Sequence, residues 1–367
     1  MSPSDLFSTA TPGSGCPQIF DFGVSEPCGS AILECMPNET PAQRISRIGG
    51  LLSYRHRLNE EGVSDQAIQQ LIASNKLIRV IPGAYMRSDS WGRLFPEEKL
   101  LARTVAVGRL HRGAGVVFSH YSAAVIWGLP LWGHQGETVH LLTPRDSPSN
   151  ASHWVYRHHH AWQESDTEVV AGLVVTNLSN TIVDIARVAK PELAVGVADA
   201  GVRAMFQRSR GSVDPRVEEW RGSQLELLAN LRGGRGVRSA TKVLEFADPR
   251  SDSVAESVSR LQFARLQMEV EIQVPVRGAG VDQYWLDFKF VGQGVFGEVD
   301  GQMKYADKEL LGGQTPAQRV ISEKRREDDV RGVTGDRIVR WMPDAIGTAE
   351  RLGRRMLAFG LQVPAMQ

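Results

Sequence analysis

The chain has 367 residues, in which 42 lysines and arginines balance 42 aspartates and glutamates. This length is more than one ordinary hydrophobic core requires, so two or three domains are expected. No stretch approaches ~18 uninterrupted apolar residues, and the chain does not open with a basic segment and a long apolar run, so we expect a cytoplasmic protein that makes no membrane contact.

Residues 1–40 carry no periodic pattern and are rich in glycine, proline and serine. All three cysteines lie here, at Cys16, Cys28 and Cys35, in a spacing that matches neither a disulfide framework nor a zinc site. We predict a disordered segment. Residues 1–43 contain five acids and no lysine or arginine, which leaves a modest positive excess for the rest of the chain. That excess permits a polyanionic partner without requiring one.

A unit of short helices that ends in a hairpin follows over residues 41–90. Helices are expected over residues 41–50, 53–61 and 64–75, the last two with Ser53 and Ser64 as N-caps. Two short strands are then expected on either side of Pro82-Gly83. Helices, a short glycine turn and a hairpin in this order are typical of a winged helix-turn-helix.

In a winged helix the third helix would enter a groove of double-stranded DNA. Its outward side would offer Gln66, Gln69 and Gln70 to base edges. The basic residues expected near phosphates are Arg55, Arg57, Lys76, Arg79 and Arg87. The alternative is a helical module that only packs against its neighbours, because such units also serve protein contacts.

Residues 91–215 alternate helical and strand-like runs, which predicts a separate α/β domain. His158, His159 and His160 suggest metal ligands, but no acid or cysteine stands at a supporting spacing, so we interpret them as an exposed polar strand end. His120 is interpreted as a residue of a helix start or of the packing. Residues 216–250 belong to an arginine-rich stretch and are predicted to be a basic linker or helix.

The last domain, over residues 251–367, contains six predicted elements in the order αβββαβ. The helices are expected over 251–269 and 317–335, and the strands over 270–276, 283–291, 294–300 and 337–342. Together with the preceding units this predicts an α/β (α+β) multidomain protein.

The strands of this last domain collect polar residues on one face, because side chains alternate along a strand. That face would carry Gln273, Asp287, Lys289, Glu298 and Asp300, with Glu256 reaching in from the preceding helix. Clustered carboxylates are relieved well by Mg²⁺ or Mn²⁺, which prefer oxygen ligands and can promote phosphodiester hydrolysis. The alternative is an ordinary solvated sheet surface.

The αβββαβ order and this acid pattern resemble the PD-(D/E)xK restriction-endonuclease-like fold. More narrowly, "LDF…GEVDGQMKY…EKRREDDVRG…RIVRW" is similar to the very-short-patch-repair-like nucleases over about 110 residues. The resemblance implies that Asp287 and Glu298 are metal ligands, Asp300 a ligand or its support, and Glu256 an outer acid. It also implies that Lys304 lies near the scissile phosphate or the attacking water, and that Arg326 and Asp328 orient the site. Gln273, placed on the polar face by strand alternation, is a further supporting residue. This chain departs from the pattern at Asp300, where lysine is usual, so Lys304 or Lys289 would have to replace that lysine.

The first half resembles the AbiEi family of antitoxins and transcriptional regulators. The similarity lies in "LIRVIPGAYM", "SHYSAAVIWGLPLW" and "VVTNLSNTIVDIAR", within residues 41–205. It implies a winged helix that binds operator DNA, followed by a domain that serves antitoxicity toward a cognate toxin.

These patterns predict a DNA-binding protein with a Mg²⁺-dependent endonuclease domain. The alternative is a non-catalytic antitoxin or transcriptional autorepressor that uses both domains for binding.

Overall fold

The computed structural model describes residues 39–111, 115–144, 153–159, 162–280, 282–300 and 316–366. Helices and four sheets are distributed over these residues, which confirms the mixed α/β class. No helix in the described ranges is both long and apolar enough to span a membrane. The predicted disorder of residues 1–38 and the predicted role of Lys304 lie outside the described residues.

The N-terminal unit is a helical group closed by a three-stranded sheet in the order β1-β3-β2. Its elements are α1 (Pro41–Gly50), β1 (Ser53–Tyr54), α2 (Arg55–Glu60), α3 (Asp65–Ala73), β2 (Leu77–Ile81) and β3 (Ala84–Arg87). Ser64 caps α3 as predicted, because its side chain accepts from Ala67 N at 3.2 Å. The predicted cap at Ser53 is wrong, since Ser53 pairs with Tyr85 in the sheet and α2 starts two residues later.

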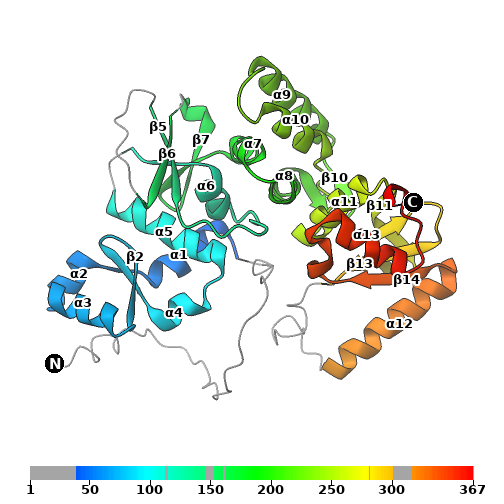
Figure 1. Ribbon diagram of the computed structural model, residues 1–367, viewed down its shortest axis with the longest axis horizontal. Coiled ribbons are helices and arrows are strands. Elements are labelled where there is room, and N and C mark those ends of the chain that lie inside the picture. The colour runs from blue at the N-terminus through cyan, green and yellow to red at the C-terminus, as the bar shows by residue number, and fades with distance from the viewer. Residues whose placement is uncertain are drawn as a thin grey trace.

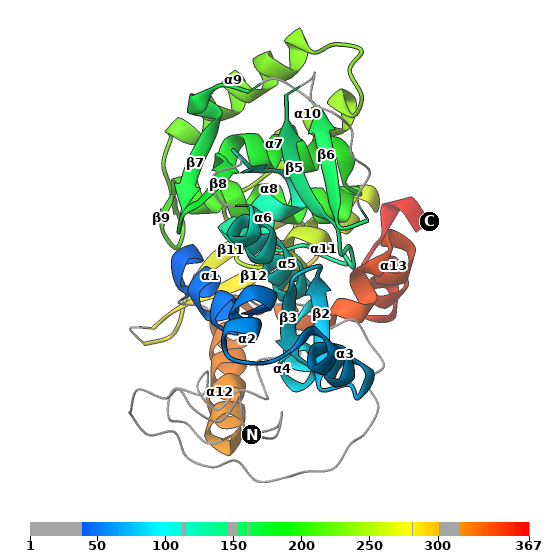
Figure 2. The same ribbon diagram turned by 90° about the vertical axis from the view of Figure 1, so that its left-hand side faces the viewer.

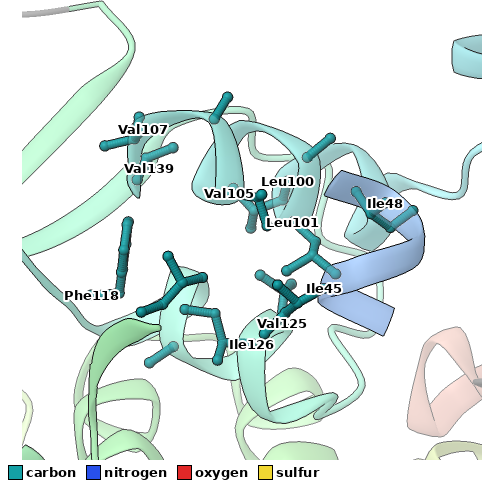
Figure 3. Close-up of a cluster of buried hydrophobic side chains, with 14 of the residues drawn as sticks. Ile45, Ile48, Leu100, Leu101, Val105, Val107, Phe118, Val125, Ile126 and Val139 are labelled. Atoms are coloured by element: carbon teal, nitrogen blue, oxygen red, sulfur yellow. The ribbon is translucent and has the colours of Figure 1, made fainter. Parts of the chain in front are cut away.

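The middle unit has a five-stranded mixed sheet in the order β6-β5-β4-β8-β7. Its strands are β4 (Val117–Phe118), β5 (Val139–Thr143), β6 (Val155–His159), β7 (Thr167–Val170) and β8 (Leu173–Thr176). Its helices are α4 (Ser88–Arg93), α5 (Pro96–Leu110) and α6 (His120–Trp127), with a 3-10 turn at Glu164–Asp166. Ile45 and Ile48 of α1 pack against α5 and α6 in one shared core, so the first two units are joined by apolar burial (Figure 3).

A layer of helices lies between the two halves of the molecule (Figure 1). It consists of α7 (Leu178–Val188), α8 (Pro191–Phe206), α9 (Arg216–Asn230) and α10 (Val237–Phe246), with the hairpin β9 (Gln207–Ser209) and β10 (Ser212–Val213). Residues 216–250 had been predicted as a basic linker or helix, and the linker interpretation is wrong. Val217 and Leu228 of α9 and Val243 and Leu244 of α10 are buried against α7 and α8, so this segment contributes to a packed core.

The C-terminal unit contains the predicted αβββαβ order around the sheet β11-β12-β13-β14. Its elements are α11 (Val254–Arg265), β11 (Val270–Arg277), β12 (Gln283–Phe290), β13 (Val295–Val299), α12 (Pro316–Thr334) and β14 (Arg337–Trp341). The strands are antiparallel except for β13 and β14, which are parallel. Figure 2 shows α12 extending away from the body of the molecule.

Aromatic side chains form the core of this unit. Phe263 of α11 meets Phe288, Phe290 and Trp341 in edge-to-face contacts with centroid distances of 5.1–5.4 Å. Trp341 Nε1 donates to Ser259 Oγ at 3.0 Å, which satisfies the indole where it is buried. A 3-10 turn at Pro343–Gly347, the helix α13 (Ala349–Ala358) and a last turn at Pro364–Met366 complete the unit.

Candidate functional site

The face of α3 that was predicted to contact DNA is exposed. Gln66, Gln69 and Gln70 point to solvent, while Ile68 and Leu71 are buried on the opposite side of the helix. The amphipathic pattern of this helix therefore places three amide side chains together on a free surface.

Two of the basic residues around this face are already bound to acids. Arg55 Nε donates to Asp65 Oδ1 at 2.8 Å, and Arg87 Nε donates to Asp89 Oδ1 at 3.1 Å. Both pairs are exposed and therefore weak, so a DNA phosphate could replace the acid as the partner of each arginine at little cost in free energy. The other predicted phosphate contacts, Arg57, Lys76 and Arg79, are exposed as well.

In the C-terminal unit, the predicted metal ligand Glu298 is held by two arginines. It lies on β13 with 7% of its surface exposed. Arg326 Nη2, from α12, contacts both carboxylate oxygens at 2.6 Å. Arg340 Nε, from the parallel neighbour β14, donates to Oε2 at 3.0 Å, because Arg340 stands directly opposite Glu298 in the register. Two guanidinium groups thus neutralise a carboxylate that a metal would need.

A second acid completes this arginine cluster. Glu323 of α12 accepts from Arg326 at 2.7 Å and also contacts Arg340. Burial raises the pKa of Glu323, but the two arginines outweigh it and hold the pKa below its usual range. Arg340 also contacts Glu327 at 3.0 Å. Glu298, Glu323, Glu327, Arg326 and Arg340 therefore form an ion network of three carboxylates and two guanidinium groups, which we call the arginine cluster.

The other two predicted ligands are also engaged with the protein. Asp287 Oδ2 accepts from Val299 N at 3.1 Å, beyond the last backbone pair of β12 and β13 at Phe288 and Gly297. Asp300 lies 4.0 Å from Arg340 Nε. Within the described ranges no group of three acids, histidines or cysteines is arranged to hold a metal ion. As they stand, these side chains do not fit a Mg²⁺ site, and the predicted metal role stays a prediction.

The predicted outer acid and its support do lie together. Gln273 Nε2 donates to Glu256 Oε2 at 2.8 Å, and both residues are buried. Glu256 also accepts from Asp252 N and Ser253 Oγ, each at 2.9 Å. Burial raises its pKa despite these bonds. Asp252 and the N-cap residue Ser253 directly precede α11, so their hydrogen bonds to the Glu256 carboxylate help to fix the start of this helix.

Asp328 is not brought to this site. It is exposed on α12 and pairs with Arg331, one turn further along the same helix. Sequence reasoning missed Glu323 instead, although it stands three residues before Arg326 and hence on the same helical face. This spacing of three residues could have predicted the pair of Glu323 with Arg326. Lys289, the other candidate to replace the missing lysine, pairs with Asp336 at 3.1 Å.

A histidine cluster in the middle unit was also missed. His140 Nδ1 lies 2.9 Å from His158 Nε2, and the ring of His120 stacks on that of His158 at 3.5 Å. The interpretation of His158 as an exposed strand end is wrong, because it is half-buried in this stack, whereas His159 is exposed. Burial lowers the pKa of His140 to about 3, with His158 and His134 adding to the effect, so this ring is neutral at physiological pH. The cluster is a packed set of rings with a neutral His140.

His120 is the first residue of α6 and is buried, which agrees with its interpretation as a helix-start residue. Its Nδ1 lies 3.5 Å from Asp184 Oδ2. Burial raises the pKa of Asp184 to about 7.

Comparison with known proteins gives only distant relatives. No family model matches the chain. A stretch of 226 residues, 61% of this chain, is 26% identical to "Uncharacterized protein MT2308" of Mycobacterium tuberculosis (strain CDC 1551 / Oshkosh) and covers 73% of that protein. The same values hold for "Uncharacterized protein Rv2248" of strain ATCC 25618 / H37Rv.

Proposed function

We propose that this chain is a duplex-DNA-binding regulator, of the autorepressor or antitoxin type, that binds without cleaving its target. The observation that carries the proposal is the exposed glutamine face of α3, which stands between a helix and a basic hairpin. Amide side chains read base edges, and the flanking arginines and lysine suit phosphates. The arrangement of α1 to β3 supports a winged helix that would present α3 to the major groove.

The non-catalytic form of the proposal rests on the arginine cluster. Glu298 already has two cations within hydrogen-bond distance, so a metal would have to displace both Arg326 and Arg340. In this arrangement the restriction-endonuclease-like order of elements is retained as a scaffold, and its charged residues stabilise the fold. The predicted Mg²⁺-dependent cleavage stays a second candidate, favoured by the order of elements.

DNA binding is tested by fluorescence anisotropy on duplexes tiled across the region upstream of the coding sequence, without added metal. We expect saturable binding whose affinity falls with salt, since counterions are released from the phosphates. Gln69→Ala should reduce the difference in affinity between duplexes of different sequence. Arg79→Ala should weaken binding to every duplex and lower the slope of log affinity against log salt concentration by about one.

The control is Arg238→Ala, which removes an exposed arginine from α10. Equal affinity for the wild type, Gln69→Ala and Arg79→Ala would contradict the assignment of α3 and the hairpin. The second candidate is tested separately with supercoiled plasmid and Mg²⁺ or Mn²⁺. Cleavage by the wild type that is lost in an Asp287→Ala, Glu298→Ala variant would replace the non-catalytic proposal.

A further inference from the structure

Two adjoining cavities lie where the N-terminal, middle and C-terminal units meet. Their volumes are about 590 and 260 Å³, and both are lined by Glu97, Pro130 and Val254. The larger one is also bounded by α1 and α8, and the smaller one by the 3-10 turn that follows β14. The larger volume falls in the range of sites for small organic ligands.

Glu97 and His134 each place on the cavity walls a buried polar atom that has no hydrogen-bond partner among the described residues. These atoms are Glu97 Oε2, on the wall common to both cavities, and His134 Nε2, on the wall of the smaller one. Both atoms are buried, and a buried polar atom without a partner costs stability. Burial raises the pKa of Glu97 to about 7 and lowers that of His134. Glu97 Oε2 therefore accepts no hydrogen bond from the described residues.

The remaining charges around the larger cavity are mutually compensated. Arg47 donates to Glu39 and Glu98, each at 2.8 Å. Arg203 lies 3.8 Å from Asp252. Over both cavities five carboxylates and four arginines line the walls, so one negative charge is left over. Glu97 is the acid among them whose Oε2 has no partner in the described part of the chain.

The rest of the larger cavity is apolar. Its walls include Phe95, Leu101, Val125, Trp127 and Leu129. A ligand that fits both features has an apolar body and a single cationic head, because burying the body stabilises the complex while the head supplies the missing partner of Glu97.

We propose that these cavities bind a small organic cation, a primary amine or guanidinium on an aromatic or aliphatic body, whose head pairs with Glu97. The N-terminal segment of the chain is a poorer occupant, because residues 1–43 contain no lysine or arginine. The site does not depend on the proposed DNA binding, since its residues lie outside the α3 face.

The test uses three probes that share one aromatic body and differ in the head group: phenethylamine, 2-phenylethanol and phenylacetate. Binding to the full chain is measured by isothermal titration calorimetry. We expect saturable binding of phenethylamine, weaker binding of the alcohol and none of the carboxylate. Glu97→Gln should weaken phenethylamine binding roughly tenfold or more, because a charge-assisted hydrogen bond is lost.

The matched control is Glu168→Gln, an exposed carboxylate on β7, which should leave the affinity unchanged. Circular dichroism checks that the variants are folded, and the comparison of head groups on the wild type needs no variant. The proposal is overturned if phenethylamine does not bind, if phenylacetate binds equally well, or if folded Glu97→Gln binds the amine as tightly as the wild type.

Discussion

Replacing Glu298 by glutamine distinguishes a carboxylate held by arginines from one that awaits a metal. In the arginine cluster both oxygens of Glu298 accept from guanidinium groups of Arg326 and Arg340. A glutamine has nearly the same size but no charge, and its amide nitrogen is a donor that would face other donors. The variant therefore removes the charged acceptor that Arg326 and Arg340 share, without opening a cavity.

The size of the effect follows from the burial of the partners. Hydrogen bonds to charged groups contribute about 1.5–3 kcal/mol, and breaking a fully buried ion pair costs about 3–5 kcal/mol. The side chains of Arg326 and Arg340 are 21% and 26% exposed, and Glu323 still contacts both. We therefore expect Glu298→Gln to lower the free energy of unfolding by about 2 kcal/mol.

Urea denaturation followed by tryptophan fluorescence measures this change, with a lower midpoint and an unchanged m value. Glu269→Gln, at an exposed acid just before β11, should leave the midpoint where it is. A metal cluster of Asp287, Glu298 and Asp300 would behave oppositely, because removing one of three like charges relieves repulsion. A raised midpoint in the variant would refute the reasoning. So would stabilisation of the wild type by Mg²⁺, which would reach about 2.7 kcal/mol at a hundred times the dissociation constant.

Three further changes test other parts of the structure. Arg260→Leu should cost about 3–5 kcal/mol in chemical denaturation, because it leaves Asp199 fully buried without its cation, and Asp199→Asn in the same chain should recover part of the loss. Burial raises the pKa of Glu97 from 4.5 to about 7, so its stabilisation is complete below pH 4.5 and is lost as the pH rises through 7. Relative to Glu97→Gln, the wild type should lose up to about 3 kcal/mol across that window in denaturation curves, and a constant difference would contradict this. Gly128→Ala should lower the melting temperature, since Gly128 has φ +82°, where an alanine is strained, and the guanidinium of Arg44 would have to move away from the added Cβ.

The order of elements in the C-terminal unit was predictable because each one carries a clear local pattern. In β12, Leu286, Phe288 and Phe290 alternate with polar residues, and this alternation coincides with burial in the structure. Likewise, Ser64 as an N-cap residue predicted the start of α3, and the apolar residues of this helix repeat with helical spacing. Local chemistry determines such features, so a single sequence reveals them.

The partners of Glu298 were not predictable in the same way. Arg340 is 42 residues away and meets Glu298 through the parallel register of two strands, which local patterns do not specify. The prediction that Glu256 reaches from its helix to the polar strand face is confirmed by its contact with Gln273. What alternation could not reveal is that arginines from α12 and β14 would approach the same face.

Of the two interpretations of residues 216–250, the helix is confirmed and the linker is wrong. Arginines and glycines suggested a linker, yet Val237, Ala240, Val243 and Leu244 repeat at intervals of three, three and one, which is a helical stripe. Their burial against α7 and α8 stabilises a helix too short to be stable alone.

Helix α11 connects the C-terminal unit to the helical layer. Its Arg260 reaches the buried Asp199 of α8 with two contacts of 2.9–3.0 Å, and its Glu256 is tied through Gln273 to Arg210 of the β9-β10 hairpin. Breaking either connection would leave a buried charged or polar group unpaired, so the C-terminal unit is held against the helical layer. Val254, in the first turn of the same helix, forms part of the wall shared by the two cavities. A cation bound at Glu97 would therefore contact a wall that α11 holds in place. Its binding free energy would stabilise the folded arrangement in which the half that carries α3 packs against the C-terminal unit.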